Sequence, residues 1–596
     1  MNQLFGYLQY FVAVFYLLSV FAAVGFSSLN IVRAPKLLSA TESILLAPVI
    51  GVAVIAIPMT VLASYEIGIS SLLVWALVIS LCSVALVMAF IKHEIGQVRT
   101  LLCQSLRSVR YWIVGIAVGF IPYFSLMLKE GFPIGFGTSA TWTNNDLGAY
   151  IQMATNVAHA GVADAGLVTG WNAGLQASFD HPGSHALFAA IARLLHREPY
   201  QVGVVLMATV MALIFLSAVV VISRISKRPI SALLISGSVV VAINPPLVAA
   251  ATNFFYPHLA SLAMSLGFCA LLLILNETSE SSGGFLILGI LTAATWLVSI
   301  EIAVVMMSLI SLFVISRKSE MGRLNLLRYL AVGHISVFAL GLLIRFTLFK
   351  SQFDVMTRMS TSGVAGWKSN FVSPTMILGM TPTQFGGPYS DGVRFWDVTI
   401  ALACLALLTV LTLRKKVDLT IASAGIALSF FVLVAVQKWG IDAYQTWKLV
   451  TTLTPFFIIL LLILLLAIDM ENLSGKWLLL PLLTVGATYS WSGSIWRDQS
   501  ASYVSQELSQ ITHTEEIQRQ VGLNVLIEPF FRTMAASVMS GVPTRMASPS
   551  YYFFEGQELL YRCTLATEET LKSIENPGPI ITRRGHYVLV GTPACD

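Results

Sequence analysis

Apolar runs of about 18 residues or more recur along the first 495 positions of this chain, and they limit its fold more than any other feature. A helix that crosses the hydrocarbon core of a bilayer needs roughly 20 mostly apolar residues. Only 11% of the residues are charged and 56% are hydrophobic, whereas a soluble domain carries about 25% charged residues. The sequence therefore predicts an α-helical polytopic membrane protein with about 13–14 transmembrane helices.

The boundaries of the apolar runs give approximate limits for these spans. They are 9–32, 43–64, 70–91, 111–129, 199–222, 229–250, 258–276, 284–299, 302–316, 329–349, 397–413, 418–437, 449–468 and 477–495. The pair at 284–316 has a second interpretation as one kinked span, which would invert the orientation of everything after it. The basic loops further along the chain favour two spans.

Short basic loops between the apolar runs predict the orientation, because Lys and Arg concentrate in cytoplasmic loops. The basic segments are "RAPK" (33–36), 92–110, "RISKR" (224–228), 317–328 and "RKK" (414–416). With these in the cytoplasm, the outside segments are 65–70, 130–198, 251–257, 350–396, 438–448 and everything from 496. The first apolar run has its basic residues on its far side, so we interpret it as a retained span and not as a signal peptide.

The composition changes to that of an ordinary globular domain after residue 495. We therefore predict two domains, a membrane domain over 1–495 and an extracytoplasmic domain over 496–596. A helical-looking segment followed by short strands at 524–529 and 585–591 indicates a small α/β domain. Its only cysteines, Cys563 and Cys595, are a disulfide candidate in an oxidising compartment. Two buried free thiols are the alternative.

The first long outside loop contains "TWTNNDLGAYIQMATNVAHAG" (141–161). Its apolar residues recur at helical spacing, which predicts a helix along the membrane surface that starts at Asp146. One role for Asp146 is an N-cap, a position that favours Asp and Asn. The other is a catalytic carboxylate. The two roles do not exclude each other.

Downstream, "FDHPGSH" (179–185) leads into a short apolar helix. Pro182 keeps His181 extended, so the strip is predicted to be a turn. His181 and His185 have a spacing that can place two metal ligands on one helical face, but no HExxH pattern accompanies them. Polar groups satisfied at a helix interface are the alternative. We predict no cofactor and no metal site, and the need for a divalent metal stays open.

The succession of "NDLGAYIQMA" (145–154), a loop, "HPG" (181–183), a short helix, a basic turn and a long span resembles the GT-C glycosyltransferases. These membrane enzymes use polyprenyl-phosphate sugars, and protein O-mannosyltransferases and lipid A aminoarabinose transferases are examples. Their usual pattern is D-E-x-x-Y-x-x-x-A followed by H-P-P. Here Leu147 replaces the second acid and Gly183 the second proline. The resemblance covers about 140–275.

The resemblance implies an inverting glycosyltransferase in the bacterial inner membrane, with its site on the periplasmic side. It implies that Asp146 is the general base for an acceptor hydroxyl and that Tyr150 positions the donor or the acceptor. The expected partners are the lipid bilayer, a polyprenyl-phosphate sugar donor and a glycan, lipid or protein acceptor such as pilin, with no nucleic acid. A large outside C-terminal domain is also implied.

Transfer from a polyprenyl phosphate also needs groups that stabilise the departing phosphate. Charge at the membrane boundary is costly and usually functional, which makes such residues the candidates. The expected substrate-binding residues, besides Tyr150, are His181, His185, His258, Arg345, Lys350, Arg358, Tyr444 and Lys448. Interfacial anchoring is the alternative for the last two, and a helix-end hydrogen bond for His258.

The loop 350–396 is rich in Gly, Ser, Thr, Pro and Met, and we expect it to close over a bound donor or to be a plain connection. The C-terminal domain could recognise the acceptor. Two other functions stay open: an O-antigen-type polymerase or ligase, and a transporter or flippase for lipid-linked sugars. The chain has no visible internal repeat, which is less typical of a transporter.

Overall fold

The computed structural model describes the N-terminal half of the membrane domain and most of the C-terminal domain. The described residues are 2–32, 38–91, 108–123, 127, 140–141, 146–159, 181–242, 244–277, 282–300, 502–528, 530–542, 544–546, 561–572, 574 and 577–591, with isolated helical residues within 302–335 and 451–463. The expected loop 350–396 and the spans predicted over 397–437 and 477–495 lie outside them.

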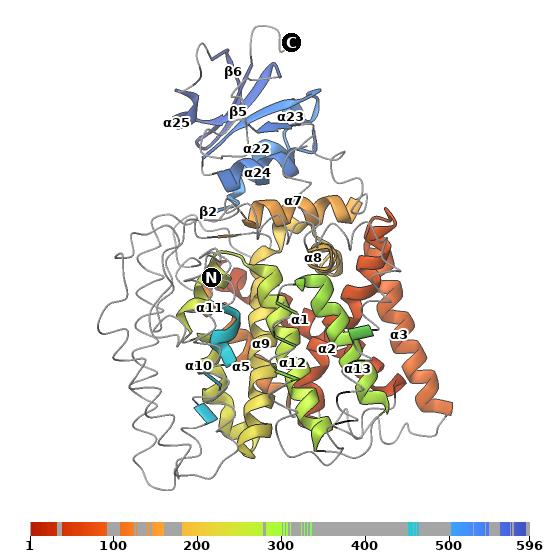
Figure 1. Cartoon of the computed structure of the whole chain (residues 1–596). Helices are drawn as coiled ribbons and strands as arrows, with labels where there is room; N and C mark the ends of the chain where they lie inside the picture. Colours follow the sequence, from red (N-terminus) through yellow and green to blue (C-terminus); the bar gives the residue numbers. More distant parts are fainter. Residues whose placement is uncertain are drawn as a thin grey trace, which may run out of the picture.

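Five of the described helices are long and apolar enough to cross a membrane. They are α1 (Asn2–Ile31), α2 (Ala40–Ser64), α3 (Ser71–Ile91), α9 (Gly203–Ser226) and α12 (Tyr256–Asn276). In Figure 1 they run roughly parallel and form a bundle, with α9 and α12 at its centre. The chain is therefore a multi-pass helical membrane protein, as its hydropathy predicts.

Helices α1 and α2 pack against each other unusually closely because glycine faces backbone on both sides. A Cβ atom at Gly25 would lie 2.0 Å from the carbonyl oxygen of Ala47, and one at Gly51 would lie 1.9 Å from that of Phe21. Apolar helices in lipid gain little from the hydrophobic effect when they associate, so small residues that allow close backbone contact stabilise the pair.

Two expected spans differ from prediction, and prolines give the reason. The helix expected over 111–129 is α5 (Arg110–Phe120), which gives way to the short 3-10 helix η2 (Ile121–Tyr123) around Pro122. The span expected over 229–250 is divided into η5 (Ile230–Leu233), α10 (Leu234–Ala242) and α11 (Pro245–Thr252). Proline lacks an N–H and disfavours helix at the residue before it, so the prolines at these positions favour the breaks. Helix α13 (Ser282–Val298) follows α12.

The break before α11 is stabilised by a buried amide. The side chain of Asn244 is fully buried, and its Oδ1 accepts a hydrogen bond of 3.2 Å from the backbone N–H of Leu247. This contact satisfies a donor in the first turn of α11 that the helix itself cannot satisfy.

A group of ion pairs joins three helices at the end of the bundle away from the C-terminal domain. Arg224, near the end of α9, is paired with Glu42 at the start of α2 and with Glu277, which follows α12. The nearby Lys227 is also paired with Glu277. Glu42 additionally forms a capping box with Ser39 at the start of α2. Segments expected in the cytoplasm therefore lie together at one end.

Above the other end of the bundle lies a layer of short helices, α7 (Asp146–His159), α8 (Pro182–Leu194) and the 3-10 helix η4 (Pro199–Gln201). Figure 1 shows α7 lying across the top of the bundle, with α8 beneath it. The apolar residues Leu147, Ile151 and Ala154 of α7 are fully buried. The helix expected from the spacing in 141–161 is thus present.

The C-terminal domain is a small α/β domain above α7 (Figure 1). Its elements are β2 (Ser502–Tyr503), α22 (Gln506–Thr512), α23 (Glu515–Gln518), β3 (Leu523–Leu526), α24 (Phe530–Ser540), β4 (Thr544–Met546), β5 (Cys563–Thr567), α25 (Glu568–Leu571), β6 (Ile580–Arg584) and β7 (Tyr587–Gly591). The sheet order is β4-β3-β5-β7-β6. Strand β3 is parallel to β4 and β5, while β7 is antiparallel to β5 and β6. Both strands expected from the sequence are present as β3 and β7.

Strand β2 pairs outside this sheet. It is antiparallel to β1 (Ala140–Thr141) of the first outside loop, with Ala140 opposite Tyr503 and Thr141 opposite Ser502. The C-terminal domain is therefore joined by backbone pairing to the segment just before α7.

Candidate functional site

Asp146 is the first residue of α7, so the helix begins where the sequence predicts. Both predicted roles of Asp146, N-cap and general base, stay predictions. The structure describes its backbone position, and its side chain lies outside the described residues.

Tyr150 lies one helical turn after Asp146 and contacts α8 and the connection between α11 and α12. Its ring centroid is 5.7 Å from that of His185 and 6.3 Å from that of Phe254. Tyr150 is partly exposed, while His185 is almost completely buried. Two of the candidate substrate-binding residues, Tyr150 and His185, are therefore in contact.

His181 and His258 meet at the starts of two different helices. Their ring centroids are 5.8 Å apart and the rings are nearly perpendicular. His181 is the N-cap residue of α8, and His258 is in the first turn of α12; each of these helices has proline in its first turn. Both histidines are 3% exposed. The N-terminal ends of two helices thus approach each other, and helix N-termini favour negative charge.

The aromatic residues beside these histidines are a feature that the sequence prediction missed. The fully buried ring of Phe254 lies 5.9 Å from the ring of Phe188 and 6.1 Å from that of Tyr256. Phe254 has a φ of +59°, a conformation that is rare for a bulky residue. It follows the end of α11, a place where glycine is usual. No sequence signal marks such a phenylalanine, because the packed rings around it hold the conformation.

The far end of α7 is fixed by a polar cluster of His159, Arg193 and Glu198. Arg193 donates to Glu198 over 2.6 Å, and Nε2 of His159 lies 3.4 Å from Glu198. The hydrogen bond from His159, followed by the hydrogen bond and charge of Arg193, lowers the pKa of Glu198 to about 2, although partial burial acts in the opposite direction. Glu198 is thus a carboxylate at neutral pH.

The same cluster ties α7 to the connection between α2 and α3. Nε of Arg193 is 3.4 Å from the carbonyl oxygen of Ile69, and the hydroxyl of Ser71 donates to the carbonyl of Arg193 over 2.9 Å. The backbone N–H of Ile69 donates to the carbonyl of Val157 over 3.1 Å. The 65–70 connection, which we expect outside the membrane, is therefore at the same end of the bundle as α7.

No three His, Cys, Asp or Glu side chains among the described residues come together in a way that could hold a metal ion. His181 and His185 therefore do not form a metal centre with any described third ligand. Their ring contacts instead place them in the aromatic cluster under α7.

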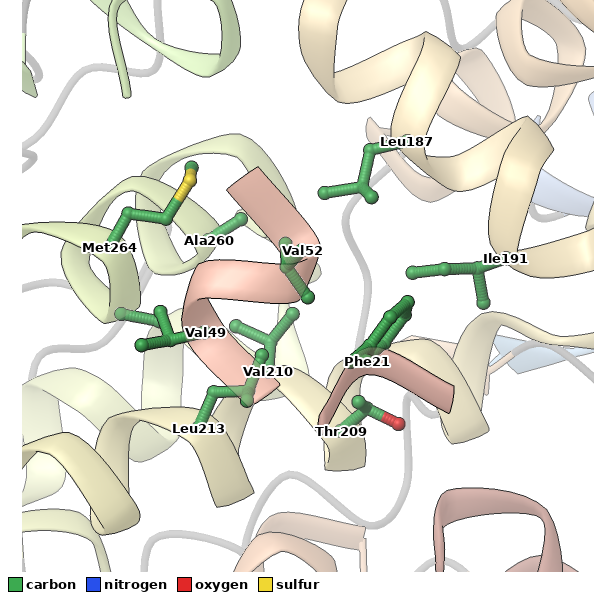
Figure 2. A pocket seen from close by; sticks show the side chains of 11 residues that line it. Phe21, Val49, Val52, Leu187, Ile191, Thr209, Val210, Leu213, Ala260 and Met264 are labelled. Atoms are coloured by element: carbon green, nitrogen blue, oxygen red, sulfur yellow. The ribbon is translucent and has the colours of Figure 1, made fainter. Parts of the chain in front are cut away.

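The small cavity of Figure 2 lies deeper in the bundle. It has room for about one water molecule. Its lining is almost entirely apolar and comes from α1, α2, α8, α9 and α12. The one hydroxyl in this lining, of Thr209, donates to the carbonyl of Val205. The cavity is a packing gap and has no groups for a charged or sugar ligand.

Several expected site residues lie outside the described residues: Arg345, Lys350, Arg358, Tyr444 and Lys448. Their predicted contacts with substrate stay predictions. Cys563 is disulfide-bonded, whereas Cys82 and Cys269 are free. Cys595 is outside the described residues, so its pairing with Cys563 also stays a prediction.

Comparisons with known proteins add little to this geometry. No family model matches the sequence, and no curated protein matches it either. Among solved structures, the crystal structure of ArnT from Cupriavidus metallidurans in the apo state is similar over 81% of this chain and 97% of that chain, with 13% identity and a TM-score of 0.44. At this TM-score the similarity carries no weight for fold or function. The function is therefore inferred from the residues of this chain.

Proposed function

We propose that this protein is a GT-C-type inverting glycosyltransferase. It moves a monosaccharide from a polyprenyl-phosphate donor to an acceptor hydroxyl at the outer side of the bacterial cytoplasmic membrane, with Asp146 as general base. The acceptor is a glycan, a lipid or a secreted protein. The observation that carries the proposal is a pair of contacts near Asp146: Tyr150, in the helix that begins at Asp146, lies against His185 of α8, and His181 at the start of α8 lies against His258.

This arrangement suits the chemistry of the step. The acceptor oxygen forms a bond to the anomeric carbon, the bond from that carbon to the phosphate oxygen breaks, and polyprenyl phosphate leaves. The acceptor proton passes to the carboxylate of Asp146. The negative charge that builds on the leaving phosphate is stabilised by helix N-termini and by His181 and His258. The predicted cations, above all Arg345 and Lys448, would add to that charge stabilisation.

The location of these residues also suits a lipid-borne donor. His258 lies in the first turn of the membrane-spanning helix α12, and His181 precedes α8, the helix that lies beneath α7 in Figure 1. A polyprenyl chain in the bilayer would then have its phosphate at the level of His258, while the acceptor approaches from the aqueous side.

The test is a transfer assay with purified protein and radiolabelled polyprenyl-phosphate sugars. Asp146→Asn should lower turnover by about 10²–10⁴-fold, the usual contribution of a general base. Asp164→Asn and Asp180→Asn are matched controls in the same outside loop, and they should keep near wild-type turnover. Size-exclusion profiles that match the wild type exclude misfolding as the cause.

Unchanged turnover in Asp146→Asn would exclude the base role. Loss of turnover in Asp164→Asn instead would move that role to Asp164. An O-antigen-type polymerase or ligase would transfer whole oligosaccharides and depend on Asp146 much less.

A second candidate is a flippase for lipid-linked sugars, and one observation favours it. The helix expected over 229–250 is broken at the buried Asn244, and transporters often place such breaks at their substrate site. Movement of the lipid-linked sugar between leaflets without any transfer to acceptor, measured in proteoliposomes, would support this candidate and contradict the transferase.

A further inference from the structure

The C-terminal domain makes two contacts near Asp146, one with the strand that precedes α7 and one with α7 itself. Strand β2 pairs with β1, which ends at Thr141, shortly before α7 begins at Asp146. Helix α24 packs along α7 itself. In Figure 1 α7 lies between α24 above and α8 below.

Burial along α7 is the second observation. A helix that lies on a membrane with one face in water leaves its polar face exposed. Here the polar residues Gln152 and Asn156 are fully buried and Thr155 is 5% exposed, just as the apolar Ile151 is buried. Polar groups removed from water on this scale need fixed hydrogen-bond partners. Both faces of α7 are therefore covered, one of them by the C-terminal domain.

A third contact lies beside α7. Tyr200 of η4 hydrogen-bonds the side chain of Ser509 of α22. Tyr200 is 8% exposed, and η4 packs on α7. The Tyr200–Ser509 contact thus links the C-terminal domain to η4. Helix η4 directly follows Glu198, which is paired with His159 at the end of α7.

We propose that the C-terminal domain is a fixed wall of the catalytic site that positions α7, and not a separately moving domain that only recruits the acceptor. Strand β2 and helix α24 set the position of Asp146 and Tyr150, while Tyr200 and Ser509 are positioning residues. The catalytic consequence rests on the proposed transferase function; the docking itself does not. Displacing a reacting group by about 1 Å can cost about 10²-fold in rate, so the fixed contact matters for turnover.

The docking is tested by cysteine crosslinking in the full-length protein in membranes. The background carries Ser in place of Cys82, Cys103, Cys269 and Cys404 and keeps the two cysteines of the C-terminal domain. Two variants place cysteines at partner positions, Ala140→Cys with Tyr503→Cys and Thr141→Cys with Ser502→Cys. Antiparallel partners lie close enough for a disulfide, closest at the non-hydrogen-bonded pair. Ala140→Cys with Glu515→Cys is the control, because the exposed Glu515 has no partner in β1.

We expect at least one partner pair to crosslink in most molecules under mild oxidation, the control pair to crosslink in few, and the crosslinked enzyme to keep its turnover. Absence of crosslinking in both partner pairs would overturn the docking. A crosslinked form that loses transfer and regains it on reduction would overturn the fixed wall, because it would mean that the domain has to move.

The positioning role is tested by kinetics. Tyr200→Phe and Ser509→Ala each remove one hydroxyl and should lower kcat roughly fivefold, the equivalent of one neutral hydrogen bond, with KM for the acceptor unchanged. Gln510→Ala, an exposed residue of the same helix, is the matched control and should behave as the wild type. A higher KM with unchanged kcat would show acceptor recruitment instead and refute positioning. If the wild type transfers no sugar at all, the proposed function fails while the crosslinking result still stands.

Discussion

The ion pairs of Arg224 allow a prediction of how much folding stability is lost when Arg224 is replaced. The magnitude depends on how deeply its partners are buried. The side chain of Glu42 is 6% exposed and that of Arg224 is 24% exposed. Arg224 also donates to Glu277 over 3.1 Å. Arg224→Met would leave Glu42 charged and nearly buried, with only its capping contacts at Ser39.

Removing one partner of a buried ion pair costs about 3–5 kcal/mol. Because Arg224 keeps some contact with water, we expect about 2–3 kcal/mol for Arg224→Met. Lys227→Met is the matched control: Lys227 is 63% exposed and pairs with the same Glu277. An exposed pair contributes about 0–1 kcal/mol. The two variants each remove one cation from the same end of α9. The difference between their losses of stability therefore reports the effect of the buried pairing of Arg224.

The assay is the midpoint of heat-induced loss of the monodisperse peak in detergent, at low and high salt. Arg224→Met should lower the midpoint clearly more than Lys227→Met, and only the Lys227 effect should shrink in high salt. The double variant Arg224→Met with Glu42→Gln should lose less than the two single changes added together, because no unpaired charge is left. Equal midpoints for Arg224→Met and Lys227→Met, or strict additivity in the double variant, would refute the reasoning.

Three further predictions concern packing, pH and the disulfide. Gly51→Ala should strongly reduce the yield of folded protein, because its Cβ would meet backbone at 1.9 Å, whereas Gly289→Ala, with open space around it, should not; detergent size-exclusion measures both. Glu198→Gln should lower the melting midpoint at neutral pH. The pKa of Glu198 is about 2 in the folded protein, against an ordinary value of 4.5, so its stabilisation is complete above about pH 4.5 and is lost as the pH falls towards 2. The difference between the melting midpoints of wild type and variant should therefore close over that range. A difference that stays constant would contradict this. Cys563→Ser should lower the melting midpoint of the C-terminal domain, as removal of a native disulfide costs a small domain about 2–5 kcal/mol. Cys595→Ser should have the same effect if these two cysteines pair, and no effect if they do not.

The sequence predicted those features of the fold that depend on short stretches of chain. The length and hydropathy of the apolar runs predicted helices such as α2, α9 and α12. The spacing of Leu147, Ile151 and Ala154 predicted α7. The break between α10 and α11 was also visible in principle, because two prolines at 245–246 interrupt the apolar run. It was missed because hydropathy alone does not register the loss of a backbone donor.

The sequence could predict which residues belong to the candidate site, but it could not predict which of them are in contact. The resemblance of 145–183 to the glycosyltransferase pattern identified Tyr150, the spacing ahead of a short helix identified His181 and His185, and a position at the membrane boundary identified His258. Their contacts depend on how α7, α8 and α12 pack. Phe254 was not predicted, because its left-handed backbone is imposed by its packed neighbours and not by its own preference.

By itself, the sequence determined the helical class, the membrane-spanning character and the place where α7 begins, because helix periodicity and hydropathy are properties of neighbouring residues. Only the tertiary structure decided that α24 covers α7 and that β2 pairs with β1. These contacts join segments hundreds of residues apart, and nothing in either segment specifies the other. The physical reason is that burial of both faces of α7 is a property of the assembled layers, which no local pattern contains.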